Sequence, residues 1–200
     1  MAWQVASRWR IWPAGKTFPA SIGYADSAAF FSSGPAGLPL DARRAGIAPQ
    51  ASCAESIDSA LARVLERHGC TAVLRATYTD ATGTFMITLG VVVSRGAAPA
   101  PGTLPGGRGL RPGVRPVAFA GTLAARFGIR QRQLANALAY GPYLILYTAG
   151  YTDGRRRDQV AANPYIASEM TSAAKGIAAA VGTRLGSPPP PPTCPGAPGC

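Results

Sequence analysis

Hydrophobic and polar residues alternate along two adjacent stretches near the middle of the chain, 71–79 and 84–94. In the second stretch every other residue from Phe85 to Val93 is large and apolar, and this period of two is typical of a β-strand. The residues between the stretches read DATG, where Asp favours the first position of a type I turn and Gly accepts a positive φ. The pattern therefore predicts an antiparallel hairpin.

A third alternating stretch, 143–152, predicts another strand, and its end resembles the end of the first. Both read Tyr-Thr-Asp before a glycine turn, as YTDATG from Tyr78 and YTDGRRR from Tyr151. Asp80 and Asp153 are acid–base candidates only through this parallel placement, because an Asp before a glycine turn already has a structural role. We interpret the two stretches as strand ends at the same edge of a sheet rather than as a repeated functional motif.

Apolar residues spaced by three or four predict helices elsewhere in the chain. In SIDSALARVLERHG the stripe of Ile57, Leu61 and Leu65 has helical spacing, and Ser56 or Asp58 can cap the first turn. The elements predicted outside the three strands are helices at 56–69, 120–139 and 166–185, a short first strand within 18–26 and a mostly loop segment at 31–50. Together the elements predict an α+β fold, an antiparallel sheet with helices packed on one face.

Proline and glycine divide the chain into a folded part and its surroundings. The predicted organisation is a flexible basic and aromatic leader at 1–17, a single α+β domain at 18–185 with a mobile Pro/Gly/Arg-rich insertion at 95–116, and a Pro-rich tail at 186–200. The insertion is half Gly and Pro, a composition that favours neither helix nor strand. The tail contains the run PPPPP, which is typical of an extended polyproline segment or linker.

The charge is strongly basic, with 20 Lys and Arg residues against 9 Asp and Glu residues and a formal net charge of +11. No acidic residue lies between Asp80 and Asp153. A balance of this kind favours acidic partners such as nucleic acid, anionic lipid or an acidic protein face, while a solvated arginine-rich surface remains the simpler interpretation. The expected contacts to a polyanion or partner are Arg108, Arg111, Arg115, Arg155, Arg156 and Arg157, and a nucleic-acid site would add Arg130, Arg132 and stacking on Tyr143, Tyr147 and Tyr151.

Motifs of the common catalytic and cofactor-binding sites do not occur. The sequence has no GxxxxGK[ST] phosphate loop, and GTLPGGRG lacks both the lysine and a following helix. The single histidine, His68, lies at the end of a predicted helix, where its interaction with the helix C-terminus explains it. One histidine and cysteines without C-x₂-C spacing do not make a common zinc set. We therefore predict a non-enzymatic protein without a metal or cofactor.

The four cysteines fall into two close pairs. Cys53 and Cys70 flank the first predicted helix, and Cys194 and Cys200 lie in the tail. The even count is compatible with two disulfides, with free thiols as the alternative. A helix of about 11 residues is roughly 16 Å long, whereas disulfide-bonded Cα atoms lie within about 7 Å. Pairing of Cys53 with Cys70 therefore requires residues 53–57 to run back along the helix.

The sequence contains no apolar run of the roughly 18–20 residues that span a bilayer. The first residues, MAWQVASRWRIWPAGK, have no apolar core of a signal peptide, but tryptophan beside arginine is typical of a membrane-interface flank. A transmembrane helix upstream of this chain is therefore one hypothesis.

The stretches GIAPQASCAES, LARVLERHGCTAVLRATYTDATGTFMITLGVVV and GPYLILYTAGYTDGR, followed by an alanine-rich helix, resemble a known kind of domain. They are similar to extracytoplasmic domains of uncharacterised single-pass membrane proteins of high-GC actinobacteria. Such proteins commonly carry a cytoplasmic Pro-rich part and one transmembrane helix before the domain. The resemblance implies no activity and no functional residues, but it supports disulfides, which persist outside the cytosol.

The function expected from these observations is a non-catalytic, membrane-associated, extracytoplasmic domain for sensing, scaffolding or partner binding. Its partner would be a protein, another cell-envelope component or an anionic membrane surface. The alternative is a basic protein that binds nucleic acid or another polyanion, which would be cytoplasmic if no transmembrane helix precedes it.

Overall fold

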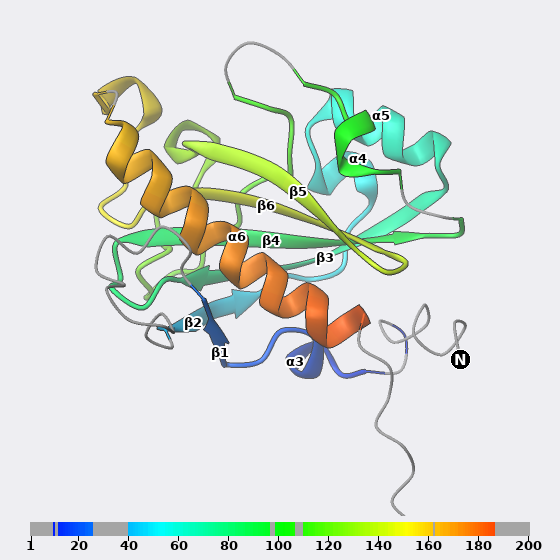
Figure 1. Ribbon diagram of the computed structural model, residues 1–200, viewed down its shortest axis with the longest axis horizontal. Coiled ribbons are helices and arrows are strands. Elements are labelled where there is room, and N and C mark those ends of the chain that lie inside the picture. Colours follow the sequence, from blue (N-terminus) through cyan, green and yellow to red (C-terminus); the bar gives the residue numbers. More distant parts are fainter. Residues whose placement is uncertain are drawn as a thin grey trace, which may run out of the picture.

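A computed structural model describes residues 10, 12–25, 40–96, 99–106, 110–161 and 163–186. It confirms the α+β class: six antiparallel strands form one curled sheet in the order β1-β2-β3-β4-β6-β5 (Figure 1). The strands are β1 (Ser21–Tyr24), β2 (Leu40–Ile47), β3 (Cys70–Thr79), β4 (Phe85–Ser94), β5 (Leu134–Tyr140) and β6 (Tyr143–Tyr151). The helices are α3 (Ala14–Thr17), α4 (Cys53–Ser56), α5 (Ser59–Arg67) and α6 (Pro164–Gly186), with short 3-10 turns η1 (Pro101–Thr103), η2 (Ile129–Gln131) and η3 (Arg157–Gln159).

The predicted hairpin forms the middle of the sheet. β3 pairs with β4 along nearly its whole length, with Tyr78 opposite Ile87, and the other side of β4 pairs with β6. Every residue from Phe85 to Val93 is buried, because β4 is a central strand covered on both faces. Strands β3, β4 and β6 thus confirm the alternating patterns of the sequence.

The helices cover both faces of the sheet, which corrects the expectation that they pack on one face. The long helix α6 crosses one face diagonally, while α4 and α5 lie on the other (Figure 1). On the α6 face, Met170, Ile177 and Val181 pack with the odd-numbered residues of β4. The opposite face is also apolar, because the alternate positions of the strands hold residues such as Val92 and Leu144. It therefore needs a cover of its own, and α5 supplies it through Leu61 and Leu65, both of them predicted core positions.

The first predicted helix is divided in two. Ile57 is extended and forms an isolated bridge with Val114, so α4 ends before it and α5 begins after Asp58. The cap of α4 is Ser52, which forms a capping box with Glu55. Asp58 holds the N-cap position of α5 as predicted, but its side chain makes no capping hydrogen bond. The prediction of one continuous helix over 56–69 is therefore wrong at its start.

Two further segments differ from the sequence-based expectation. The helix predicted at 120–139 is wrong, because its second half is strand β5 and its first half contains turns and η2. The segment resembled a helix because alanine favours helix and because leucines four residues apart fit the spacing of a helix as well as that of a strand. In the structure β5 instead pairs with β6, and a two-residue loop that begins at Gly141, whose φ is 54°, joins the two strands. The loop expected at 31–50 is wrong over β2, where Ala42 alone is fully buried and the hydrophobic pattern is weak. Residues 26–39 lie outside the described part.

Much of the expected 95–116 insertion contacts the core. Val114 is fully buried against Gly90, where an added Cβ would lie only 2.9 Å from the valine side chain. Beyond it, the Val117 carbonyl accepts a 2.7 Å hydrogen bond from the buried Thr77 hydroxyl, and its N–H donates to Thr88. Residues 110–116 thus contribute a buried side chain to the core, although their only regular structure is the isolated bridge between Val114 and Ile57. Residues 97–98 and 107–109 lie outside the described part.

Only the last third of the predicted leader is described as a continuous segment. Trp12 packs against the α6-side core, Lys16 lies 4.6 Å from the centre of its ring, and Thr17 is buried at the end of α3. None of the helices in the described ranges combines the length and hydropathy needed to cross a membrane.

Candidate functional site

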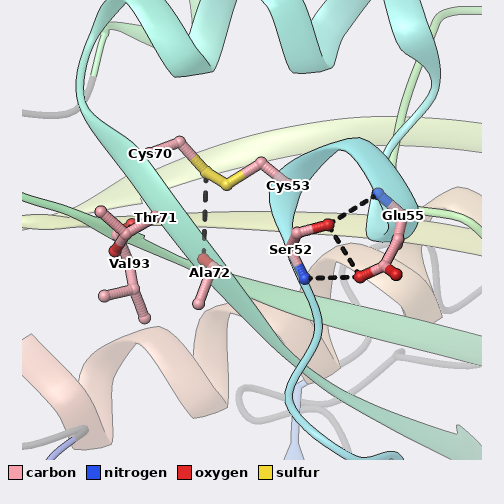
Figure 2. The surroundings of a disulfide bond; sticks show 7 residues. All are labelled: Ser52, Cys53, Glu55, Cys70, Thr71, Ala72 and Val93. Atoms are coloured by element: carbon pink, nitrogen blue, oxygen red, sulfur yellow. Dashed lines mark hydrogen bonds between the residues drawn. A yellow bond between two sulfur atoms is a disulfide. The ribbon is translucent and has the colours of Figure 1, made fainter.

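A disulfide joins α4 to the start of β3. Cys53 and Cys70 are bonded with their Cα atoms 6.4 Å apart, and Figure 2 shows the bond beside the Ser52–Glu55 capping box. The extended residue Ile57 allows this closure, because it breaks the helix and lets α4 run back toward β3. Of the two alternatives that the sequence left open, the structure thus supports the disulfide, and residues 53–57 run back as that pairing requires. Cys194 and Cys200 lie outside the described residues.

The two Tyr-Thr-Asp stretches meet at one end of the sheet. β4 begins opposite the end of β6, with Phe85 paired to Tyr151, and the Thr152 N–H donates a 3.0 Å hydrogen bond to the Thr84 carbonyl. This arrangement confirms the interpretation as neighbouring strand ends. Asp80 is buried, and its carboxylate accepts hydrogen bonds from the backbone N–H groups of Phe85 at 2.6 Å and Thr82 at 3.1 Å. Its oxygens therefore hold the turn together.

The second turn carries charge on the surface. Asp153 pairs with Arg155, whose Nε atom donates a 2.6 Å hydrogen bond to the carboxylate. This hydrogen bond holds the pKa of Asp153 below its ordinary value. Arg155 also lies over the ring of Tyr151, 4.6 Å from its centre. Of the predicted run 155–157, this first arginine is thus engaged within its own turn.

The other two arginines of that run line a surface hollow of about 520 Å³, within the range typical of small-molecule sites. The lining residues are Leu110, Ile129, Arg130, Arg132, Arg156, Arg157 and Asp158. They come from three separate segments: the end of the expected insertion, the η2 turn that leads into β5, and the loop that follows β6. Arg156 pairs with Asp158 at 3.1 Å across this loop.

Arg132 is the buried member of the set. Only 7% of the residue is exposed, and its Nη1 atom donates a 2.7 Å hydrogen bond to Oδ2 of Asp58. The same Asp58 oxygen accepts a 2.9 Å hydrogen bond from the Gly113 N–H. The Nε atom of Arg132 is also buried, and no acceptor among the described residues takes its hydrogen.

The remaining predicted contact arginines do not join the hollow. Arg111 lines a separate, narrow crevice with Leu104 and Asn136. Arg115 is held near α4, where its guanidinium donates to the Glu55 carbonyl oxygen at 3.5 Å. Arg108 lies outside the described residues.

The proposed aromatic stacking surface is wrong. Tyr143, Tyr147 and Tyr151 point into the α6-side core and are 3%, 1% and 8% exposed. Burial raises the pKa of the Tyr147 hydroxyl. These rings therefore cannot stack on nucleotide bases without opening the core.

His68 is exposed and ends α5 at its C-cap, as expected for a structural histidine. In the described segments no three side chains of His, Cys, Asp or Glu lie close enough together to hold a metal ion.

Comparisons with protein-family models, curated proteins and solved structures find no match to this chain.

Proposed function

We propose that the chain is a non-catalytic binding domain that works outside the cytosol, at the cell surface, and contacts an acidic partner through its arginine-rich side. The observation that carries the proposal is the Cys53–Cys70 disulfide. Structural disulfides persist in oxidising compartments and are rare in the cytosol. The resemblance to extracytoplasmic domains of actinobacterial membrane proteins points the same way and suggests a membrane anchor outside this chain.

The proposal of a non-catalytic domain is supported by the two carboxylates that were acid–base candidates in the sequence, because both already have partners within the protein. Asp80 is buried in its turn, and Asp153 is paired with Arg155. Neither carboxylate lies among the residues that line the 520 Å³ hollow. The one carboxylate that lines the hollow, that of Asp158, pairs with Arg156, and the other charged groups there are guanidiniums, which suit the binding of an anion rather than proton transfer.

Cell labelling with disulfide mapping tests the compartment. Intact cells that express the protein from its own reading frame are treated with a membrane-impermeant amine reagent, then lysed in a thiol-blocking buffer for non-reducing peptide mapping. We expect label on the chain and linked peptides containing Cys53 and Cys70, with a cytosolic protein as the unlabelled control. Blocked, unlinked cysteines on an unlabelled chain would refute the proposal.

The alternative is a cytoplasmic protein that binds nucleic acid or another polyanion. The observation in its favour is the clustering of Arg130, Arg132, Arg156 and Arg157 around one hollow on a chain with a net charge of +11. Specific binding of this kind is expected to weaken steeply with salt, because it releases counterions. Reduced cysteines in cells together with a sequence- or strand-selective oligonucleotide complex would favour it over the first proposal.

A further inference from the structure

The arginine-lined hollow contains an unsatisfied donor. Arg132 is almost completely buried, and only Asp58 accepts a hydrogen bond from its guanidinium within the described residues. Its buried Nε–H has no acceptor there. An unpaired donor on a buried cation is unfavourable, and such groups in folded proteins are normally satisfied by protein, water or ligand. Arg132 lines the hollow, so a ligand bound there lies beside this guanidinium.

The charge around the hollow is not balanced by the protein. Four arginines line it, and the two aspartates that pair with them, Asp58 and Asp158, leave a formal charge of 4 − 2 = +2. Arg130 and Arg157 are exposed, and neither forms an ion pair with a carboxylate in the part of the chain that the structure describes. Their forked donors remain available for an oxyanion.

We propose that this hollow binds a phosphate monoester. A phosphomonoester carries a charge of about −1.5 to −2 at pH 7, which matches the unbalanced charge, whereas a carboxylate carries only one negative charge. Three phosphoryl oxygens can accept from the guanidinium groups of Arg130, Arg132 and Arg157 together. The Arg132 Nε–H is buried, so the guanidinium has to turn toward the hollow before this group can donate to one of these oxygens.

The rim of the hollow indicates what the phosphate is attached to. Ile129 is 53% exposed beside the arginines, and Leu110 lines the same hollow. A ligand with an apolar group next to its phosphate would cover these side chains and gain affinity from the buried apolar surface. This requirement is met by a soluble aryl or alkyl phosphate and equally by the phosphomonoester headgroup of a lipid. The inference specifies the ligand of the proposed binding domain and does not depend on its compartment.

The test is a titration of the oxidised full chain, followed by the NMR signals of the backbone and of the arginine Nε–H groups. The probes are phenyl phosphate, inorganic phosphate and benzoate at constant ionic strength and pH 7.5. We expect phenyl phosphate to bind most tightly, to shift the Arg132 Nε–H signal, and to exceed benzoate by about tenfold or more, as the loss of a charge-assisted hydrogen bond implies.

Matched variants distinguish the contribution of the hollow to binding from that of the total charge of the protein. The double variant Arg130→Gln/Arg157→Gln removes two exposed arginines of the hollow, and Arg63→Gln/Arg67→Gln removes two exposed arginines of α5. We expect the first to weaken phenyl phosphate binding by about tenfold or more and the second by less than about twofold. Thermal unfolding of both variants checks that they remain folded.

Vesicles distinguish the two sources of the ligand. Phosphatidylcholine vesicles are prepared with phosphatidic acid, a monoester, or with phosphatidylglycerol, a diester, at equal surface charge. Selective binding to phosphatidic acid that phenyl phosphate inhibits identifies a lipid ligand, and phenyl phosphate binding without vesicle binding identifies a soluble one.

Three results would overturn the inference: no phenyl phosphate binding at millimolar concentration, equal binding of benzoate, or equal losses in the two double variants. None of these results bears on the disulfide or on surface labelling in cells, so they leave the proposed compartment standing.

Discussion

At the scale of single residues, Asp58 joins three parts of the chain. One carboxylate oxygen accepts from the Gly113 N–H and from the Arg132 guanidinium, and Asp58 itself precedes α5. The guanidinium is buried, and Asp58 is the carboxylate that compensates its charge. Breaking a buried pair by removing one partner is strongly destabilising, because it leaves an uncompensated charge.

We therefore predict that Asp58→Ala lowers the free energy of unfolding by about 3 kcal/mol. The matched control is Asp158→Ala, which removes the exposed partner of Arg156 and should cost less than about 1 kcal/mol. Urea unfolding followed by circular dichroism measures both. Similar small losses in the two variants would show that the Asp58–Arg132 pair does not stabilise the fold.

Two buried tyrosines make the free energy of unfolding vary with pH in the alkaline range. Burial raises the pKa of Tyr78 and of Tyr147, because the interior disfavours the phenolate. A pKa raised on folding means that the stabilisation is complete below the ordinary tyrosine pKa of about 10 and is lost as pH rises through the folded-state value.

We expect the free energy of unfolding to fall as pH rises above about 10, with a smaller slope in Tyr147→Phe, which removes one ionising group. Unfolding in urea at intervals between pH 8 and 11.5 measures the slope. Tyr78→Phe is the less clean variant, because the Tyr78 hydroxyl also donates a 2.9 Å hydrogen bond to the Pro19 carbonyl. An unchanged slope in Tyr147→Phe would contradict the prediction.

At the scale of elements, α6 packs closely on β5 because Gly182 lies against the ring of Tyr140. Replacing a helical glycine with alanine ordinarily stabilises a helix by about 0.5–1 kcal/mol. Here the added methyl would overlap the ring, so we predict that Gly182→Ala instead destabilises the protein by about 1–3 kcal/mol. In a Tyr140→Ala background, which opens the space, the same change should become neutral or stabilising. Thermal unfolding of the original protein, the two single variants and the double variant measures the coupling between the two positions. Additive effects would show that the contact with Tyr140 is not the cause of the destabilisation.

The disulfide is a second connection between elements, because it joins α4 to β3. Cys53 and Cys70 are separated by 17 positions, and closing a loop of this size stabilises a protein by about 3 kcal/mol in the chain-entropy description. We therefore expect Cys53→Ser/Cys70→Ser to lower the free energy of unfolding by about 2–4 kcal/mol relative to the oxidised chain. The variant should accordingly unfold at a lower urea concentration. Equal midpoints would mean that the capping box and the Ile57–Val114 bridge hold α4 without the disulfide.

The elements that the sequence predicted well are those whose own pattern carries the information. β3, β4 and β6 have apolar residues at alternate positions, and α6 has apolar residues spaced by three or four along an alanine-rich segment. The strand β5 could not be distinguished from a helix, because Leu134 and Leu138 fit both spacings and pairing with β6 decides between them. The break at Ile57 depends on Val114, more than fifty positions away, and no local signal indicates it.

At the scale of the whole molecule, the hollow is assembled from segments whose meeting the sequence does not reveal. The run 155–157 could be selected by its charge, and Arg130 and Arg132 were candidates in an acid-free interval. Arg132 pairs with Asp58, which lies 74 positions away in the sequence. This pairing marks Arg132 as a buried cation, whereas the sequence alone gives no reason to separate it from the surface arginines. Charge patterning thus located the arginines, but the fold was needed to separate those that share a site from those engaged elsewhere.

The net charge of +11 and the local charge of the hollow make different predictions for binding. Non-specific attraction of an oligonucleotide depends on the summed field of the protein and falls with salt as counterions are released. We expect a 20-nucleotide single strand, if bound at 50 mM salt, to lose affinity by about tenfold or more at 200 mM. Arg130→Gln/Arg157→Gln and Arg63→Gln/Arg67→Gln should weaken this binding equally, because each removes two positive charges. Fluorescence anisotropy with a labelled strand measures all three proteins. A loss confined to the hollow variant would instead place the nucleic-acid strand in the hollow and favour the polyanion-binding alternative.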